Sequence, residues 1–142
     1  MKAHEIITLT SLIRNAANDF IEKELEAHGV TGVVPAHGTI LKILFDNRDG
    51  IPMKELVEIS GKAKSTITSN MNTLLKYGYI VKEQDPSDAR SQLITLTNEG
   101  KALEQIFVNT SEKLLSRVYK DISVEDQNQV ARILNNICKN IC

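Results

Sequence analysis

The sequence predicts a mainly α-helical protein with one small β-hairpin. Apolar residues recur at three- and four-residue spacing over most of the chain, which is typical of amphipathic helices. The exception is "VKEQDPSDARSQLITLT" (residues 81–97), where two alternating runs flank a charged turn. We therefore expect helices along most of the chain and a hairpin in its second half.

The bulk composition fits one globular domain. The chain has 142 residues, of which 42% are hydrophobic and 25% charged, and this balance permits a buried core. It lacks an apolar run of about 18 residues, and its first residues lack the apolar centre of a signal peptide. We therefore expect a cytoplasmic protein that does not contact a membrane.

Two helices are predicted on either side of a glycine-containing break. Helical spacing runs from about Glu5 to Ala27, and "HGVTGVV" then interrupts it. Pro35 suits the first turn of the next helix, where its missing N–H group costs nothing. This second helix is apolar on nearly every side, so we expect it at the centre of the core. Its apolar residues are Ile40, Leu41, Ile43, Leu44 and Phe45.

Two shorter helices follow, separated by "SGKAK". The first is expected to start at Pro52 and to turn Leu56, Val57 and Ile59 inward. The second is "KSTITSNMNTLLKYG", with Gly78 as its C-terminal stop. Its apolar face is expected to carry Ile67, Met71, Leu74 and Leu75. Two such helices around a glycine-containing turn predict a helix-turn-helix, whose second helix enters a DNA major groove.

The hairpin and two long helices complete the chain. The strands are expected at Tyr79–Asp85 and Gln92–Leu96, with the charged turn between them. Thr97 is expected to cap the fifth helix, and Ser123 with Asp126 to form a capping box for the sixth.

The long helices have larger apolar faces than a small core can cover. A symmetric partner would bury the excess, so the sequence predicts a homodimer. We expect residues 1–142 to form a single domain, in which a winged helix-turn-helix region of about 35–97 lies between dimerisation helices of about 4–28 and 98–142.

The face of the fourth helix opposite Ile67 has the character of a DNA-reading surface. Its side chains are short and polar, and residues 60–82 hold four lysines but no acid, in a chain whose net charge is −1. An ordinary solvated face usually carries acids as well, and lysines at the start of the helix suit phosphate binding. The candidate DNA-binding residues here are Lys62, Lys64, Ser65, Thr66, Thr68, Ser69, Asn72 and Lys76.

A hairpin directly after such a helix is typical of a wing that reaches the neighbouring minor groove. Arg90 is expected to enter that groove, whose negative potential attracts arginine. Asp88 is expected to pair with the Arg90 guanidinium and to aim it. The hairpin alone would also fit a solvated turn with a weak surface ion pair, but its position after the helix favours the wing.

These features resemble the MarR (multiple-antibiotic-resistance regulator) family of winged-helix transcription factors over essentially the whole chain. "KSTITSNMNTLLKYGYI" is similar to the family's recognition helix, and "DPSDARSQLITLTNEGK" to its wing, with the D-x-R signature at Asp88 and Arg90. Ala89 and Ser69 stand where many members have arginine. The resemblance implies an obligate homodimer on a double-stranded, pseudo-palindromic DNA operator, most commonly as a repressor.

The resemblance also implies a small aromatic or anionic effector that releases the DNA. The family's effector cleft lies between the dimerisation and DNA-binding regions. We expect it beneath the first helix, where Ala16 and Ala17 leave space on an otherwise bulky stripe. The expected lining residues are Ile13, Ala17, Phe20 and His37.

The sequence gives less support to metal-binding, enzymatic or redox functions. His4, His28 and His37 lack metal-ligand spacing, and the chain has no phosphate loop or nucleophile elbow, so no metal, cofactor or enzymatic activity is expected. Cys138 and Cys142 are one helical turn apart, which suits a disulfide within a helix poorly. We expect them to pack, and a redox link between subunits is the alternative.

Two alternatives to the DNA-binding, ligand-responsive regulator stay open. One is a winged helix used for protein–protein contact, which would tolerate acids on the fourth helix and need no arginine on the hairpin. The other is a redox- or metal-responsive regulator of the same fold.

Overall fold

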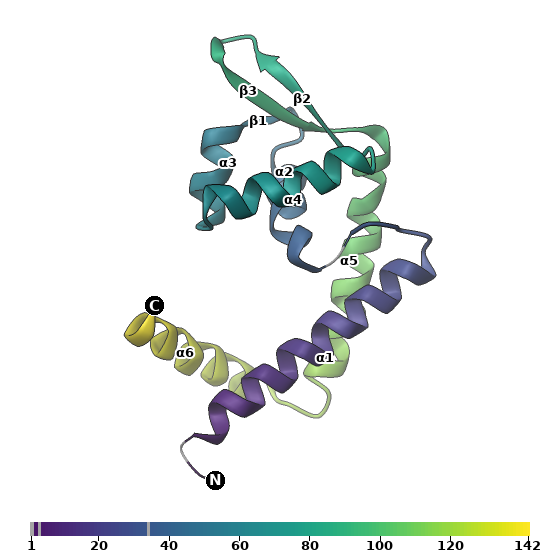
Figure 1. Ribbon diagram of the computed structural model, residues 1–142. Helices are drawn as coiled ribbons and strands as arrows, with labels where there is room; N and C mark the ends of the chain where they lie inside the picture. The colour runs from purple at the N-terminus through teal and green to yellow at the C-terminus, as the bar shows by residue number, and fades with distance from the viewer. Residues whose placement is uncertain (1, 3, 34) are drawn as a thin grey trace.

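The computed structural model describes residues 2, 4–33 and 35–142, and it confirms a mainly helical protein with a small antiparallel sheet (Figure 1). The first half contains α1 (Glu5–Ala27), the short 3-10 helix η1 (Pro35–His37), α2 (Gly38–Asp46), β1 (Ile51–Pro52), α3 (Met53–Ser60) and α4 (Lys64–Lys76). The second half contains β2 (Ile80–Asp85), β3 (Asp88–Leu96), α5 (Asn98–Val118) and α6 (Val124–Ile141).

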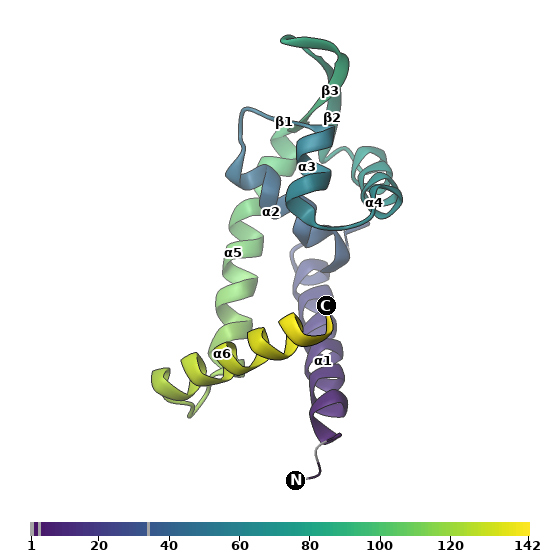
Figure 2. The same ribbon diagram turned by 90° about the vertical axis from the view of Figure 1, so that its left-hand side faces the viewer.

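The elements form two layers. One is a lobe of α2, α3, α4 and the sheet, from which the β2–β3 hairpin projects (Figure 1). The other consists of α1 and the lower part of α5, which lie side by side, with α6 extending away from the lower end of α5 (Figure 2). Because α5 runs through both layers, it connects the hairpin to the long helices. No helix in the described parts of the chain is both long and apolar enough to span a membrane.

Helix α2 is the centre of the core, as its composition predicts. Its Ile40, Leu41 and Leu44 are fully buried, because apolar side chains face α3, α4 and β3 on its different sides. Helix α4 contributes the predicted face, with Ile67, Met71 and Leu74 fully buried.

The prediction for α3 is wrong at one position. Leu56 is buried and Val57 half-buried, but Ile59 is 55% exposed. Residues two apart on a helix point about 200° apart, so α3 cannot bury both Val57 and Ile59 against one neighbour.

The sheet contains a strand that the sequence pattern did not reveal. Its order is β1-β3-β2, all antiparallel, with Ile51 opposite Ile94 and Ile80 opposite Leu96. Strand β1 has only two residues, one of them a proline without an N–H group, so it fits only at an edge. A run this short has no periodicity from which to predict it.

The hairpin is longer than expected. Strand β3 begins at Asp88, so Arg90 lies within the strand and the turn holds only Pro86 and Ser87. Gln84 is opposite Gln92, whereas Asp85 is opposite Asp88. Residues 89–91 therefore form a bulge on β3 that has no counterpart on β2.

Thr97 and Ser123 are confirmed as N-caps, but the described residues show only the Ser123 half of the predicted capping box. The Thr97 hydroxyl accepts the Gly100 N–H at 3.1 Å, and the Ser123 hydroxyl accepts the Asp126 N–H at 3.1 Å. The Thr97 N–H also donates to the Tyr79 carbonyl at 3.0 Å. The start of α5 is therefore attached to the start of the wing.

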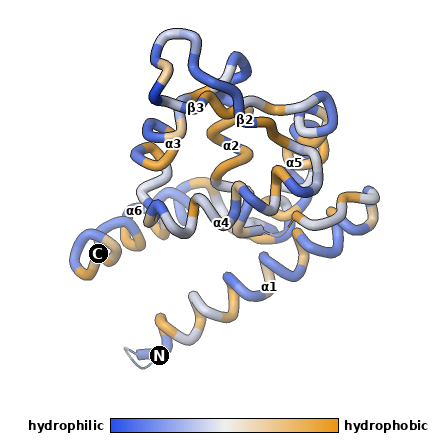
Figure 3. The backbone as a smooth tube through the Cα atoms, turned by 45° about the horizontal axis from the view of Figure 1, so that its top comes forward, coloured by the Kyte–Doolittle hydropathy of each residue, from blue (hydrophilic) through white to orange (hydrophobic). Residues whose placement is uncertain are grey.

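The long helices keep much of their apolar surface exposed. Figure 3 colours their hydrophobic residues orange, at intervals along the backbone. Lys113 forms an ion pair with Glu24 at 3.0 Å, which joins α5 to α1. Helix α6 has no buried residue, although one of its faces is apolar. The exposed apolar residues of α1, α5 and α6 include Ile7, Leu12, Ile13, Leu115, Val118, Val130, Ile133 and Ile141.

Candidate DNA-binding surface

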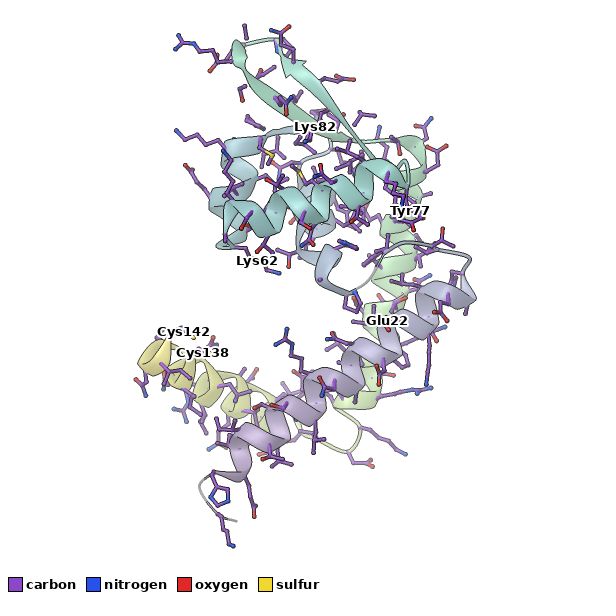
Figure 4. All side chains as sticks on the ribbon, in the orientation of Figure 1. Glu22, Lys62, Tyr77, Lys82, Cys138 and Cys142 are labelled. Carbon is purple, nitrogen blue, oxygen red and sulfur yellow. The ribbon has the colours of Figure 1, made fainter. Side chains whose placement is uncertain are left out.

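Helix α4 begins in a way that leaves its first N–H groups available. Gly61 ends α3 in the left-handed region at φ 64°, and Ala63 is the N-cap of α4 without a side-chain cap. Lys62 and Lys64 are exposed beside this end (Figure 4 labels Lys62). Uncapped N–H groups, the positive end of the helix dipole and two ammonium groups together favour a phosphate.

The outward face of α4 carries the predicted polar residues. Because Ile67, Met71 and Leu74 hold the helix against the core, the opposite side chains are directed to solvent. Thr68 departs slightly, because it lies next to the buried face and is half-buried. The other predicted residues of this face are exposed: Ser65, Thr66, Ser69, Asn72 and Lys76. The helix contains no acid, so nothing on it neutralises Lys64 and Lys76.

The two wing residues contact each other differently from the prediction. The Asp88 carboxylate accepts the backbone N–H of Arg90 at 3.0 Å, and among the residues described no ion pair joins it to the guanidinium. The expected pairing of the two side chains is therefore wrong. Inside the bulge the Arg90 N–H has no strand partner opposite it, and a carboxylate two residues earlier satisfies it. Asp88 thus fixes the backbone of the bulge.

The tip of the wing is held by a second carboxylate. Asp85 accepts the backbone N–H of Ser87 at 2.9 Å and its hydroxyl at 2.8 Å. These hydrogen bonds, the backbone one first, lower the pKa of Asp85. The Gln84 side-chain amide also donates to the Ala89 carbonyl at 3.2 Å, across the bulge.

A hollow of about 680 Å³ joins the wing to the helix-turn-helix. Lys64 at the start of α4 and Arg90 on the wing both line it, although they are far apart in sequence. Sequence reasoning missed Lys54, Ser91 and Gln92, which also line it. The sequence could have indicated Lys54 as a phosphate-binding candidate, because it lies in the first turn of α3. It could not have indicated Ser91 and Gln92, because their positions depend on the bulge.

The predicted effector residues are only partly brought together. Ile13, Ala17 and Phe20 line a cavity of about 390 Å³ between α1 and α5. Arg117 of α5 also lines it, and its guanidinium carbon lies 4.8 Å from the centroid of the Phe20 ring. His37 does not line this cavity. It is buried at the end of η1, where burial lowers its pKa and favours the neutral imidazole.

The fold and this surface define a winged helix-turn-helix protein. A model of the MarR family matches residues 35–92, the segment from η1 to the wing. This segment of the chain is therefore similar to the MarR family.

Two similar proteins are named as an HTH-type transcriptional repressor and an HTH-type transcriptional regulator. The HTH-type transcriptional repressor YetL of Bacillus subtilis (strain 168) is 30% identical over 99 residues, which cover 69% of this chain and 59% of YetL. The HTH-type transcriptional regulator SarZ of Staphylococcus aureus (strain USA300) is 26% identical over 100 residues, which cover 70% of this chain and 64% of SarZ. The match thus spans less than two thirds of either relative.

Two solved structures show the same fold. The MepR–DNA complex of S. aureus has a TM-score of 0.81 at 17% identity and covers 99% of both chains. A MarR family transcriptional regulator from Streptomyces coelicolor, in complex with DNA, has a TM-score of 0.77 at 20% identity, covering 100% of this chain and 94% of that one.

Proposed function

We propose that the chain is a transcriptional regulator that binds double-stranded DNA sequence-specifically, most simply as a repressor. One observation carries this proposal: Lys64 and Arg90 line the same hollow. This hollow lies beside α4, whose outward face has no acidic residue. Small polar side chains let a helix approach base edges closely, and the cations beside them bind phosphates. Relatives named as an HTH-type repressor and regulator support it.

The regulator acts as a homodimer in this proposal. Many apolar residues of α1, α5 and α6 stay exposed among the described residues, and α6 has no buried residue at all. A second copy related by a two-fold axis would cover these residues. The same axis would present two α4 helices and two wings to a pseudo-palindromic operator.

Selection of bound sites from random DNA tests this function. We expect an enriched pseudo-palindrome whose half-sites are separated by about one helical turn. Sedimentation should show a dimer at micromolar concentration. An asymmetric half-site bound at full affinity would contradict the dimeric arrangement, and the absence of any enriched sequence would favour a protein-binding winged helix.

Substitution of Asp88 separates a geometric role from an electrostatic one. Asp88→Ala removes the acceptor of the Arg90 N–H and is expected to weaken operator binding roughly 2- to 10-fold per half-site, as the loss of one hydrogen bond implies. Asp88→Asn is the matched control, because its amide oxygen can still accept that N–H. It should bind at least as tightly as wild type, since it removes a negative charge near phosphates.

Titrations of the three proteins against one operator at two salt concentrations decide the matter. If Asp88→Ala binds more tightly than wild type at both salt concentrations, Asp88 does not position Arg90 and acts only through its charge.

The effector of this regulator is, in our proposal, a small aromatic carboxylate in the cavity between α1 and α5. Ile13 and Ala17 offer apolar contacts and Phe20 an aromatic one, while the Arg117 guanidinium can bind a carboxylate. A volume of about 390 Å³ is sufficient for a single aromatic ring with its substituents. Because α5 also anchors the wing, a ligand that moves α5 against α1 would move the wing.

Salicylate is therefore expected to weaken operator binding roughly tenfold at millimolar concentration, within the usual range of allosteric coupling. Ala17→Leu should abolish this response by filling the cavity and leave operator affinity without salicylate unchanged. Ala27→Leu, the same substitution at an exposed position of α1, should retain the response.

Fluorescence anisotropy of a labelled operator measures all three proteins. An unchanged affinity of wild type across a panel of aromatic carboxylates would remove the effector proposal. A full response in Ala17→Leu would place the effector elsewhere, for example in the cavity of about 530 Å³ that Phe45 and Phe107 line between α2 and α5.

A further inference from the structure

Two thiols lie at the C-terminal end of α6, Cys138 in the helix and Cys142 directly after its last residue. Cys138 and Cys142 are both free and exposed (Figure 4). The Cys142 N–H donates to the Cys138 carbonyl at 2.7 Å, so the helical hydrogen-bond pattern continues through both residues. Their side chains therefore project from the same side of the helix, one turn apart.

Helix geometry determines what these two thiols can do together. Residues four apart on a helix have Cβ atoms about 5–6 Å apart. A disulfide needs a Cβ separation of about 3.5–4.5 Å, so the pair cannot close one without distorting the helix. An atom placed between two sulfurs, with bonds of about 2.3 Å, separates them by about 4.6 Å when the arrangement is linear. That span suits side chains whose Cβ atoms are one helical turn apart.

The surroundings restrict the kind of ion. Residues 127–142 contain no acid and no histidine, so α6 offers no carboxylate or imidazole ligand near the thiols. Over the described residues as a whole, no group of three or more His, Cys, Asp or Glu residues could hold a metal ion. A four-coordinate ion such as Zn²⁺ would thus lack ligands, whereas soft cations that accept two thiolates would not.

The position of the thiols on α6 keeps them accessible in the proposed dimer. Counted at about 100° per residue, Val130, Ile137 and Ile141 fall within about 40° of one another and form the apolar face. Cys138 and Cys142 lie about 100° from the centre of that face. A partner that covers the apolar face would therefore leave the two thiols at its border.

We propose that Cys138 and Cys142 form a two-coordinate binding site for a soft, thiophilic monovalent cation of the Cu(I) type, within one subunit. The cation replaces the two thiol protons and bridges the two sulfurs, without any change of oxidation state. The site lies at the end of α6, so it is separate from both α4 and the proposed effector cavity between α1 and α5.

Cu(I) added anaerobically to the protein, in competition with a coloured Cu(I) chelator, tests the proposal. We expect one Cu(I) per chain and a ligand set of two sulfurs by X-ray absorption. Cys138→Ser and Cys142→Ser should each weaken binding roughly 100-fold or more, because a second ligand on the same helix acts at high effective concentration.

The matched control keeps two thiols but changes their spacing. Cys142→Ser combined with Asn140→Cys places the second thiol about 200° around the helix from Cys138. This variant should bind Cu(I) as weakly as the single-serine variants, while circular dichroism and sedimentation confirm that the fold and the dimer are intact. Equal affinity in this variant would overturn the proposal, because spacing would then not matter. A stoichiometry of one Cu(I) per two chains would also overturn it, because the ion would then bridge subunits.

Discussion

Arg90→Ala is expected to remove most of the operator affinity without affecting the fold. Arg90 is exposed in the bulge of β3, where it lines the hollow between the wing and α4. Loss of a groove-inserted arginine costs about 1–3 kcal/mol per half-site, and a dimer presents two. Operator affinity should therefore fall roughly 30-fold or more. Thermal stability should hardly change, since the side chain is exposed.

Arg14→Ala provides the matched control. Arg14 is exposed on α1, in the layer away from the wing, so its removal changes the net charge equally. This variant should bind the operator like wild type when both are titrated by anisotropy at two salt concentrations. If both variants lose the same affinity, Arg90 contributes only to the overall charge and does not enter a groove.

Gly100→Ala is expected to destabilise the protein by roughly 2 kcal/mol, the cost of overpacking less a gain in helix propensity. Gly100 is buried in the first turn of α5, and a Cβ there would overlap the backbone carbonyl of Tyr79 and come within 3.0 Å of Leu96 Cδ2. A backbone group held by the Thr97 N–H cannot move aside alone. The start of α5 must therefore separate from the wing.

Urea unfolding measures this loss, and Gly38→Ala is the control. Gly38 is also in the first turn of a helix, but a Cβ there would meet only Phe107, at an ordinary distance of 3.9 Å. This variant should be as stable as wild type or more stable, because alanine favours helices. If Gly100→Ala proves as stable as Gly38→Ala, the contact between α5 and the wing is not rigid.

The sequence by itself was sufficient for whatever depends on local periodicity. The apolar face of α4 follows from the spacing of Ile67, Met71 and Leu74, and its polar face is then the opposite one. The caps at Thr97 and Ser123 are equally local, because each hydroxyl binds an N–H three residues later. Ile13, Ala17 and Phe20 line one cavity because helical spacing puts them on one face of α1.

Only the tertiary structure decided how separate segments meet. His37 does not join Ile13 and Phe20, because its position depends on how η1 packs into the core. Strand β1 forms only because Ile51 and Pro52 lie beside the edge of β3 and pair with it. The bulge at residues 89–91 arises from the pairing of β2 with β3, and alternation along one strand cannot specify the register of its partner. Asp88 therefore binds the backbone of Arg90, because this pairing leaves that N–H without a strand partner.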